Sequence, residues 1–219
     1  MDIKAVVFDM DGVIFDSEIK VVECWEEIAS KYGIPNIKEA CSECLGLNAK
    51  ATKEKMLLRY GEDFPYDDYK KEMSELFHSR YDNGRLPMKP GVESLLDYLK
   101  KSDYKIALAS STRREVVERE LADAGIIKYF DEIICGDMVK RSKPDPEIFI
   151  KACLNLDVPV HKAIAIEDSY NGIRAAYKAG MYPVMVPDLA PVTEEMEMLA
   201  YAILPSLDHV REFMEEDIA

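Results

Sequence analysis

Residues 3–12 have the sequence IKAVVFDMDG, a short apolar stretch that ends at two aspartates and a glycine. A continuous apolar run without polar alternation is typical of a strand in a sheet that is covered on both faces. Asp9, Asp11 and Gly12 are residue types that favour turns, so we expect the chain to leave the strand there. The predicted strand therefore delivers two carboxylates to one edge of a sheet.

Four later segments follow the same plan of an apolar strand and a polar turn. The predicted strands span residues 104–109, 132–135, 163–166 and 182–186, and helical patterns occupy 91–100, 113–124, 146–155 and 171–179. Strands that alternate with helices predict an α/β fold, with a Rossmann-like, mostly parallel sheet flanked by helices on both faces. In such sheets ligands bind beyond the carboxyl ends of the strands.

The interval between the first two strands breaks this alternation. An apolar stripe with helical spacing is formed there by Val21, Val22, Trp25, Ile28, Ala29 and Tyr32. Further helical patterns span 38–45, 51–60 and 66–81 without an intervening strand. We therefore predict an inserted all-helical domain, residues 16–86, and a core formed by residues 1–15 and 87–219.

Composition excludes several classes of partner. The chain has 219 residues and a formal charge of −14, which disfavours nucleic acid because no basic stripe is available to replace phosphate counterions. No apolar run approaches the roughly 20 residues of a membrane span, and residues 3–8 are too short for a signal peptide. The five cysteines are odd in number and scattered, which predicts structural thiols, Cys41 and Cys44 included, in a reducing cytoplasm. The sequence makes no prediction of the oligomeric state.

The pair Asp9 and Asp11 is the sharpest chemical signal. Alone the D-x-D-G pattern is weak, because an ordinary turn followed by a helix cap uses the same residue types. At the end of an apolar strand, however, two carboxylates repel each other and lose solvation unless a positive group binds there. A hard cation with oxygen ligands is the simplest answer. Glu167 and Asp168 follow the strand at 163–166 and would complete a magnesium site if the two strands are neighbours.

Two further segments suit a phosphate ester. Ser110, Ser111 and Thr112 stand between a strand and the start of a helix, where hydroxyls and free backbone N–H groups can bind phosphate oxygens. Lys143 lies in a stiff segment between Ser142 and Pro144 and is a candidate for pairing with a phosphate. Taken singly, the first segment also fits an ordinary helix cap and the second a solvated lysine.

Together these segments resemble a known family. In chain order they are Asp9-Met10-Asp11-Gly12-Val13, Ser110, Lys143-Pro144-Asp145-Pro146, and Glu167-Asp168-Ser169 with Asn171-Gly172. This order is similar to the four motifs of the haloacid dehalogenase superfamily. The helical insertion resembles the cap domain of its subgroup that contains β-phosphoglucomutase and phosphoglycolate phosphatase-like enzymes. The resemblance covers essentially the whole chain.

The resemblance implies a role for each motif. Asp9 is expected to be the nucleophile that forms an aspartyl-phosphate, and Asp11 the general acid and then the base. The bound cation would be Mg²⁺, with Asp11 contributing its backbone carbonyl. The expected metal ligands are Asp9, Asp11, Glu167 and Asp168, and the expected phosphate-binding residues are Ser110, Ser111 and Lys143.

The resemblance also narrows the reaction. Asp11 favours phosphoryl transfer, because dehalogenases of the superfamily lack this second aspartate. β-Phosphoglucomutase-like enzymes carry a histidine in the helix after the first motif and an arginine in the cap, where this chain has Val21 and Ala49. Both departures favour a phosphatase, with a phosphomutase as the alternative. The histidines of this chain are His78, His161 and His209. We expect all three to be surface residues that are poorly placed to take the role of the mutase histidine.

Specificity in this group resides in the cap, which closes over the site. The expected substrate is a small phosphorylated metabolite, and a sugar phosphate is the class we predict. Asn48 and Lys50 are the candidate substrate contacts, and Glu18, Lys20 and Lys53 are further cap residues that could face the site. A non-catalytic binding or regulatory protein on the same scaffold is a second alternative, since a fold alone does not settle function.

Overall fold

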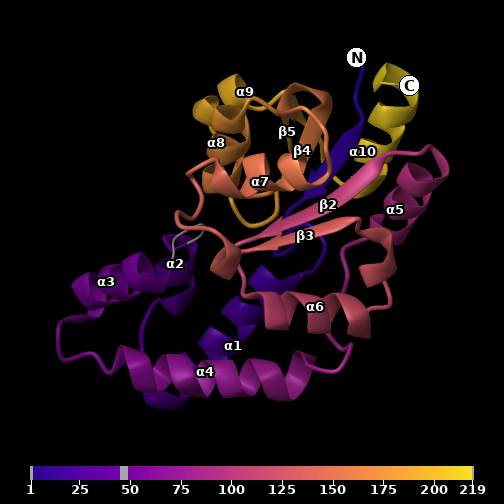
Figure 1. Ribbon diagram of the computed structural model, residues 1–219. Helices are drawn as coiled ribbons and strands as arrows, with labels where there is room; N and C mark the ends of the chain where they lie inside the picture. The colour runs from indigo at the N-terminus through magenta and orange to yellow at the C-terminus, as the bar shows by residue number, and fades with distance from the viewer. Residues whose placement is uncertain (1, 45–48, 219) are drawn as a thin grey trace.

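The computed structural model describes residues 2–44 and 49–218, which form an α/β core and a second group of helices (Figure 1). The predicted fold class is confirmed. Within the described ranges, every helix is either too short or too polar to cross a bilayer.

The core sheet has six parallel strands in the order β3-β2-β1-β4-β5-β6. The strands are β1 (Ala5–Phe8), β2 (Lys105–Ser110), β3 (Glu132–Cys135), β4 (Ala163–Glu167), β5 (Tyr182–Met185) and β6 (Ala202–Ile203). The predicted strands agree with the first five to within two residues at their ends. The sixth was missed because it has only two residues at the sheet edge, too few to show a pattern.

Strand β1 lies between β2 and β4, so Phe8 is paired with Leu108 on one side and Ile166 on the other. The strand order reverses direction at β1, and ligands of doubly wound sheets bind at such a switch point. Because all the strands are parallel, the polar residues that follow β1, β2 and β4 meet at one edge of the sheet.

The two faces of the sheet carry side chains of different size. Alternation along β4 places Ala163 and Ala165 on one face and Ile164 and Ile166 on the other. The small side chains let α7 (Glu147–Asn155) and α8 (Tyr170–Ala179) pack closely. The opposite face is covered by α5 (Val92–Lys101), α6 (Arg114–Asp123) and α10 (Leu207–Phe213). The short helix α9 (Glu194–Leu199) packs beside α8.

The second group of helices follows β1 and has an apolar core of its own, so the predicted all-helical insertion is present (Figure 1). It contains α1 (Ser17–Tyr32), α2 (Ile37–Ser42), α3 (Ala49–Tyr60) and α4 (Tyr66–Tyr81). Trp25 of α1 stacks on Tyr66 of α4 at 6.1 Å between ring centroids. The boundaries of this unit at residues 16 and 86 stay a prediction.

Candidate active site

Three carboxylates lie together at the carboxyl edge of the sheet. Asp9 follows β1, Glu167 ends β4 and Asp168 follows it, so the pairing of these two strands brings the three groups together. One carboxylate oxygen of each lies within 4.8 Å of the others, and all three residues are buried. Hard divalent cations bind such oxygen clusters. The condition set by the sequence, that the two strands be neighbours, is met.

Lys143 provides the positive charge at this cluster. Its ammonium donates to Asp9 Oδ1 at 2.5 Å, to Glu167 Oε1 at 2.6 Å and to the Ala109 carbonyl at 2.8 Å. These three bonds use all three donors of the ammonium. The lysine is therefore fixed beside the predicted nucleophile rather than solvated.

Burial sets the acid–base state of the cluster. Burial raises the pKa of Asp9 well above its ordinary value, with the charges of Glu167 and Asp11 adding to the rise and Lys143 opposing it. Burial likewise raises the pKa of Asp168, helped by Glu18 and Glu167. Burial alone would lower the pKa of Lys143, but the two carboxylates outweigh it and the pKa is raised. The cluster thus has more carboxyl groups than its single lysine can balance, and a bound cation would favour their ionised forms.

Asp168 and Glu167 differ in their partners. Glu167 Oε2 accepts from the backbone N–H and the hydroxyl of Ser169, and its other oxygen accepts from Lys143. No donor among residues 2–44 and 49–218 hydrogen-bonds Asp168, which lines the adjoining cavity. Asp168 is therefore the better candidate for a direct metal ligand, and Glu167 orients Lys143.

Two glycines allow this close packing. Gly12 has φ +80°, and a Cβ there would lie 2.3 Å from Asp168 Oδ2. A Cβ on Gly172, in the first turn of α8, would lie 1.8 Å from the Glu167 side chain. Any side chain at either position would displace a carboxylate of the cluster.

The Asp11 side chain lies outside the carboxylate cluster and is held by two hydroxyls. Its Oδ1 accepts from Ser17 at 2.7 Å, and its Oδ2 accepts from Thr112 at 2.9 Å. Ser17 begins α1, whereas Thr112 follows β2 in the core, so Asp11 connects the helical insertion to the core. The prediction that the backbone carbonyl of Asp11 binds metal does not involve this side chain and stays a prediction.

A cavity of about 370 Å³ opens over the cluster. Ser111 and Lys143, both predicted to bind phosphate, line it, together with Thr112 of the same polar segment as Ser111. Ser110 is fully buried at the end of β2, and its hydroxyl accepts the N–H of Thr112 at 3.1 Å. The polar lining therefore comes from the turn after the strand, just before α6.

The structure also groups Asp188, which the sequence analysis did not assign to the site, with two acids that it did name. One oxygen each of Glu18, Asp168 and Asp188 lies within 4.8 Å of the others. Lys89 pairs with Asp188 and, at 2.9 Å, with Asp16. Asp188 follows β5 at the same sheet edge, so the rule that placed the other acids would have found it.

The lysines predicted to contact the substrate from the cap do not lie at the site. Asn48 lies outside the described residues. Lys50 points away from both cavities: its side chain is 88% exposed and lies 3.9 Å from Glu54. Lys20 pairs with Glu23 and Lys53 with Asp67, and both partners are acids of the same helical group. The lysines named from the sequence thus neutralise cap acids, a role that sequence spacing alone does not reveal.

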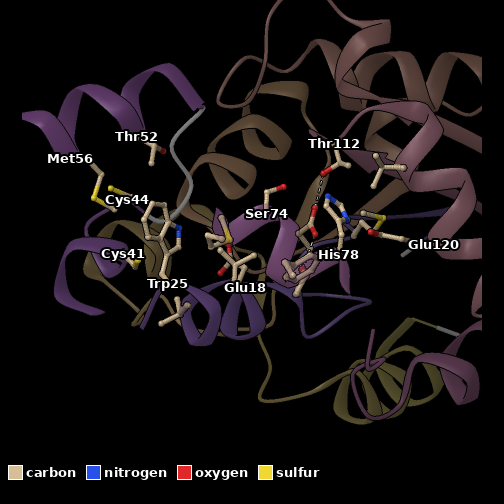
Figure 2. A pocket seen from close by; sticks show the side chains of 18 residues that line it. Glu18, Trp25, Cys41, Cys44, Thr52, Met56, Ser74, His78, Thr112 and Glu120 are labelled. Carbon is tan, nitrogen blue, oxygen red and sulfur yellow. Dashed lines mark hydrogen bonds between the residues drawn. The ribbon is translucent and has the colours of Figure 1, made fainter. Parts of the chain in front are cut away.

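The two positions at which β-phosphoglucomutase-like enzymes carry a histidine and an arginine line cavities in this structure. Ala49 lines the cavity over the carboxylates, and Val21 lines a second cavity of about 430 Å³ between the helical insertion and the core. His78 also lines the second cavity, on the same side as Thr112 and Glu120 (Figure 2). The side chain of His78 is 45% exposed, as expected of a surface residue, and whether it could take the role of the mutase histidine stays a prediction. The available signal that it lines this cavity was its helical spacing from Ser74 in α4.

The fold and the site define a hydrolase class. A profile of haloacid dehalogenase-like hydrolases matches residues 6–186. A phosphorylated carbohydrates phosphatase of Thermotoga maritima is 35% identical over 179 residues, which are 81% of this chain and 82% of the relative. The chain belongs to the haloacid dehalogenase-like hydrolase family.

Mutases are among the relatives as well. A β-phosphoglucomutase of Bacillus subtilis is 33% identical over 197 residues, covering 86% of this chain and 85% of the relative. The crystal structure of CbbY from Rhodobacter sphaeroides in complex with phosphate is similar with a TM-score of 0.74 and 28% identity, over 95% of this chain and 96% of the other. The family and these relatives identify the chain as an enzyme of the phosphoric monoester hydrolase kind, with phosphomutases among its relatives.

Proposed function

We propose that the protein is a magnesium-dependent phosphatase that hydrolyses a small phosphorylated metabolite through an aspartyl-phosphate on Asp9. The observation that carries this proposal is the arrangement of Asp9, beside Lys143 and two further carboxylates, under a cavity whose other wall holds Asp11. A phosphate monoester is a dianion, so positive charge at this point is needed before a carboxylate can attack. The names of the relatives support a sugar phosphate as the substrate class.

The donor set fits Mg²⁺. Oxygen ligands suit a hard cation, and Asp168 is a buried carboxylate for which the described chain offers no hydrogen-bond donor. Asp9 and Asp168 would bind the cation with the backbone carbonyl of Asp11. When bound, Mg²⁺ neutralises charge on the phosphate oxygens.

The chain's own residues then account for two steps. Asp9 attacks phosphorus, the bond from phosphorus to the ester oxygen breaks, and Asp11 gives a proton to that oxygen. Water next attacks the aspartyl-phosphate, Asp11 accepts a proton from it, and phosphate and free Asp9 result. The hydroxyls of Ser17 and Thr112 hold Asp11 in place for both transfers.

Hydrolysis is favoured over mutase chemistry by Val21 and Ala49. Both line the cavities, yet neither side chain can hydrogen-bond or carry charge. A mutase must hold the second phosphate of a bisphosphate intermediate, and an apolar residue at each position provides no group for this.

The test is release of inorganic phosphate from p-nitrophenyl phosphate and a panel of sugar phosphates, with Mg²⁺ or with EDTA. We expect turnover with Mg²⁺ and loss of activity with EDTA that Mg²⁺ restores. Interconversion of glucose 1-phosphate and glucose 6-phosphate with a bisphosphate primer, and little phosphate release, would identify a mutase instead. No turnover of any ester would favour a non-catalytic binding protein.

A further inference from the structure

The second cavity lies where the leaving group of the ester would extend from the carboxylate cluster. Asp11, Glu18 and Thr112 line both cavities, so the two adjoin each other. If Asp9 takes the phosphoryl group, the rest of the substrate extends past Asp11 into the second cavity. The chemistry of its walls therefore decides which leaving groups fit, and this inference rests on the proposed function.

The walls are helix faces. Val21, Val22 and Trp25 come from one face of α1, and Ser74, Phe77 and His78 from one face of α4. Thr112, Val116 and Glu120 follow one another at intervals of four residues along α6 and the turn before it. Such spacing puts side chains on the same face of a helix, so each helix presents a continuous stripe to the cavity.

Most of this lining is apolar. Trp25, Met56 and Met73 line the part of the cavity within the helical insertion, and Phe77 and Val116 continue the apolar surface towards the core. Figure 2 shows Trp25, Cys41, Cys44 and Met56 together at one end of the cavity, and His78, Thr112 and Glu120 at the other. A ligand with an apolar face can therefore contact one end while polar groups lie at the other.

Carboxyl groups are the main source of charge in the lining. Glu18 and Glu120 line the cavity with Asp11, and none of the lining residues in the described chain is a lysine or arginine. The nearby cations pair elsewhere: Arg119 lies 3.6 Å from Asp82, and Lys20 lies 2.9 Å from Glu23. A second phosphate or a carboxylate in this cavity would meet carboxylates without a compensating charge.

We propose that the substrate is a monophosphate whose leaving group carries an amine or hydroxyl donors and no second negative charge, and that Glu120 is the residue that selects it. Glu120 lies on the α6 stripe two turns beyond Thr112, facing the cavity. Its carboxylate accepts hydrogen bonds from amine or hydroxyl groups and repels anions. His78, whose Nδ1 lies 2.9 Å from Asp82 Oδ1, leaves Nε2 as a second polar group on the same side.

The electrostatic environment of Glu120 supports this assignment. Burial, with the charges of Asp11 and Asp82 adding to it and that of Arg119 opposing it, raises the pKa of Glu120 to about 7. A cationic group bound beside it would relieve the same cost of burial, so a bound amine and the carboxylate stabilise each other.

The experiment compares three esters of similar size that differ in one group: glucosamine 6-phosphate, glucose 6-phosphate and 6-phosphogluconate. For the unchanged protein with Mg²⁺ we expect kcat/KM to be highest for the amine or the hydroxyl ester and at least about tenfold lower for the carboxylate ester. Glu120→Lys should raise the ratio of 6-phosphogluconate to glucosamine 6-phosphate by about tenfold or more. Glu120→Gln should lower the preference for the amine only.

The matched control is Glu118→Lys, which makes the same change of charge on the same helix. Glu118 pairs with Arg114 at 2.7 Å and does not line the cavity, so its replacement should leave the ratio unchanged. Equal or better turnover of 6-phosphogluconate by the unchanged protein, or equal ratios in the Glu118 and Glu120 variants, would overturn the proposal.

Binding of the same three esters to the Asp9→Asn protein, measured by calorimetry, repeats the comparison without turnover. Weaker binding of 6-phosphogluconate would support the charge selection even in a protein that hydrolysed none of the esters, whereas tighter binding would contradict it. If the protein binds the esters selectively but hydrolyses none of them, the proposed hydrolysis is contradicted and the proposed charge selection is not.

Discussion

The two adjoining cavities are built in different ways. We call the cavity over the carboxylates the phosphate end of the site and the second cavity its leaving-group end. At the phosphate end, charged groups follow strand ends, are buried and are held by several bonds each, as Lys143 shows with its three acceptors. At the leaving-group end, side chains project from helices α1, α4 and α6 onto a largely apolar surface. Backbone pairing fixes the first end, whereas individual side chains define the second. Substitutions at the first end should therefore change the rate of any substrate, and those at the second end should change the choice among substrates.

The largest expected effect is that of Asp9→Asn. The amide keeps the shape of the side chain but is not a nucleophile and is a poor metal ligand, so kcat should fall by at least about 10⁴-fold for every ester. Phosphate release measures the loss, and circular dichroism should show an unchanged fold. A variant that kept near-normal rates would remove Asp9 from the reaction.

The second largest effect is expected for Lys143→Ala. Its kcat should be lower by about 10²- to 10³-fold, because the ammonium beside Asp9 stabilises charge on the transferring phosphoryl group. The metal-free variant should also lose about 3 kcal/mol of stability, since two buried carboxylates lose their cation. Urea unfolding with EDTA and with Mg²⁺ measures this, and Mg²⁺ should restore part of the loss. Lys140→Ala, outside the cavity, is the control.

The same contrast explains what the sequence was able to predict. Asp9, Glu167 and Asp168 follow apolar strands, and the parallel arrangement of strands sends all strand ends to one edge, so their proximity was predictable. Lys143 was a candidate because of its stiff proline-containing segment, and the family resemblance gave it a role, although no strand pattern precedes it directly. Asp188 obeyed the same strand rule but lacked a motif to draw attention to it.

The leaving-group end was harder to predict for a physical reason. Which face of α4 or α6 meets the cavity depends on how two helical layers pack, and an exposed glutamate has the same local pattern whether it faces solvent or a cavity. Glu120 and His78 were therefore missed. Lys50 was expected near the substrate from its position, but its side chain points to solvent.

Removing one hydroxyl from Asp11 should give a smaller effect that separates positioning from binding. In Thr112→Val, Asp11 loses the 2.9 Å bond to Oδ2, and kcat for a sugar phosphate should fall by about tenfold. The loss should be smaller for p-nitrophenyl phosphate, whose leaving group needs little protonation. Ser17→Ala, which removes the other bond, should show the same difference between the two esters. Equal losses for both esters would mean that these hydroxyls do not act through Asp11.

The smallest expected effect is a change in stability with pH at the leaving-group end. The pKa of Glu120 is raised, chiefly by burial, from 4.5 to about 7, so the folded protein holds a proton that the unfolded chain releases between these values. Stability is therefore lost as pH rises from about 4.5 to 7, and the cost is fully present above pH 7. Glu120→Gln removes this cost and should stabilise the protein by about 1–2 kcal/mol at pH 8, after allowance for partial exposure, and by almost nothing at pH 4. Urea unfolding at the two pH values measures the difference, and Glu118→Gln should show no such dependence. A gain that was equal at both pH values would show that the Glu120 carboxylate is not destabilised by its place in the cavity.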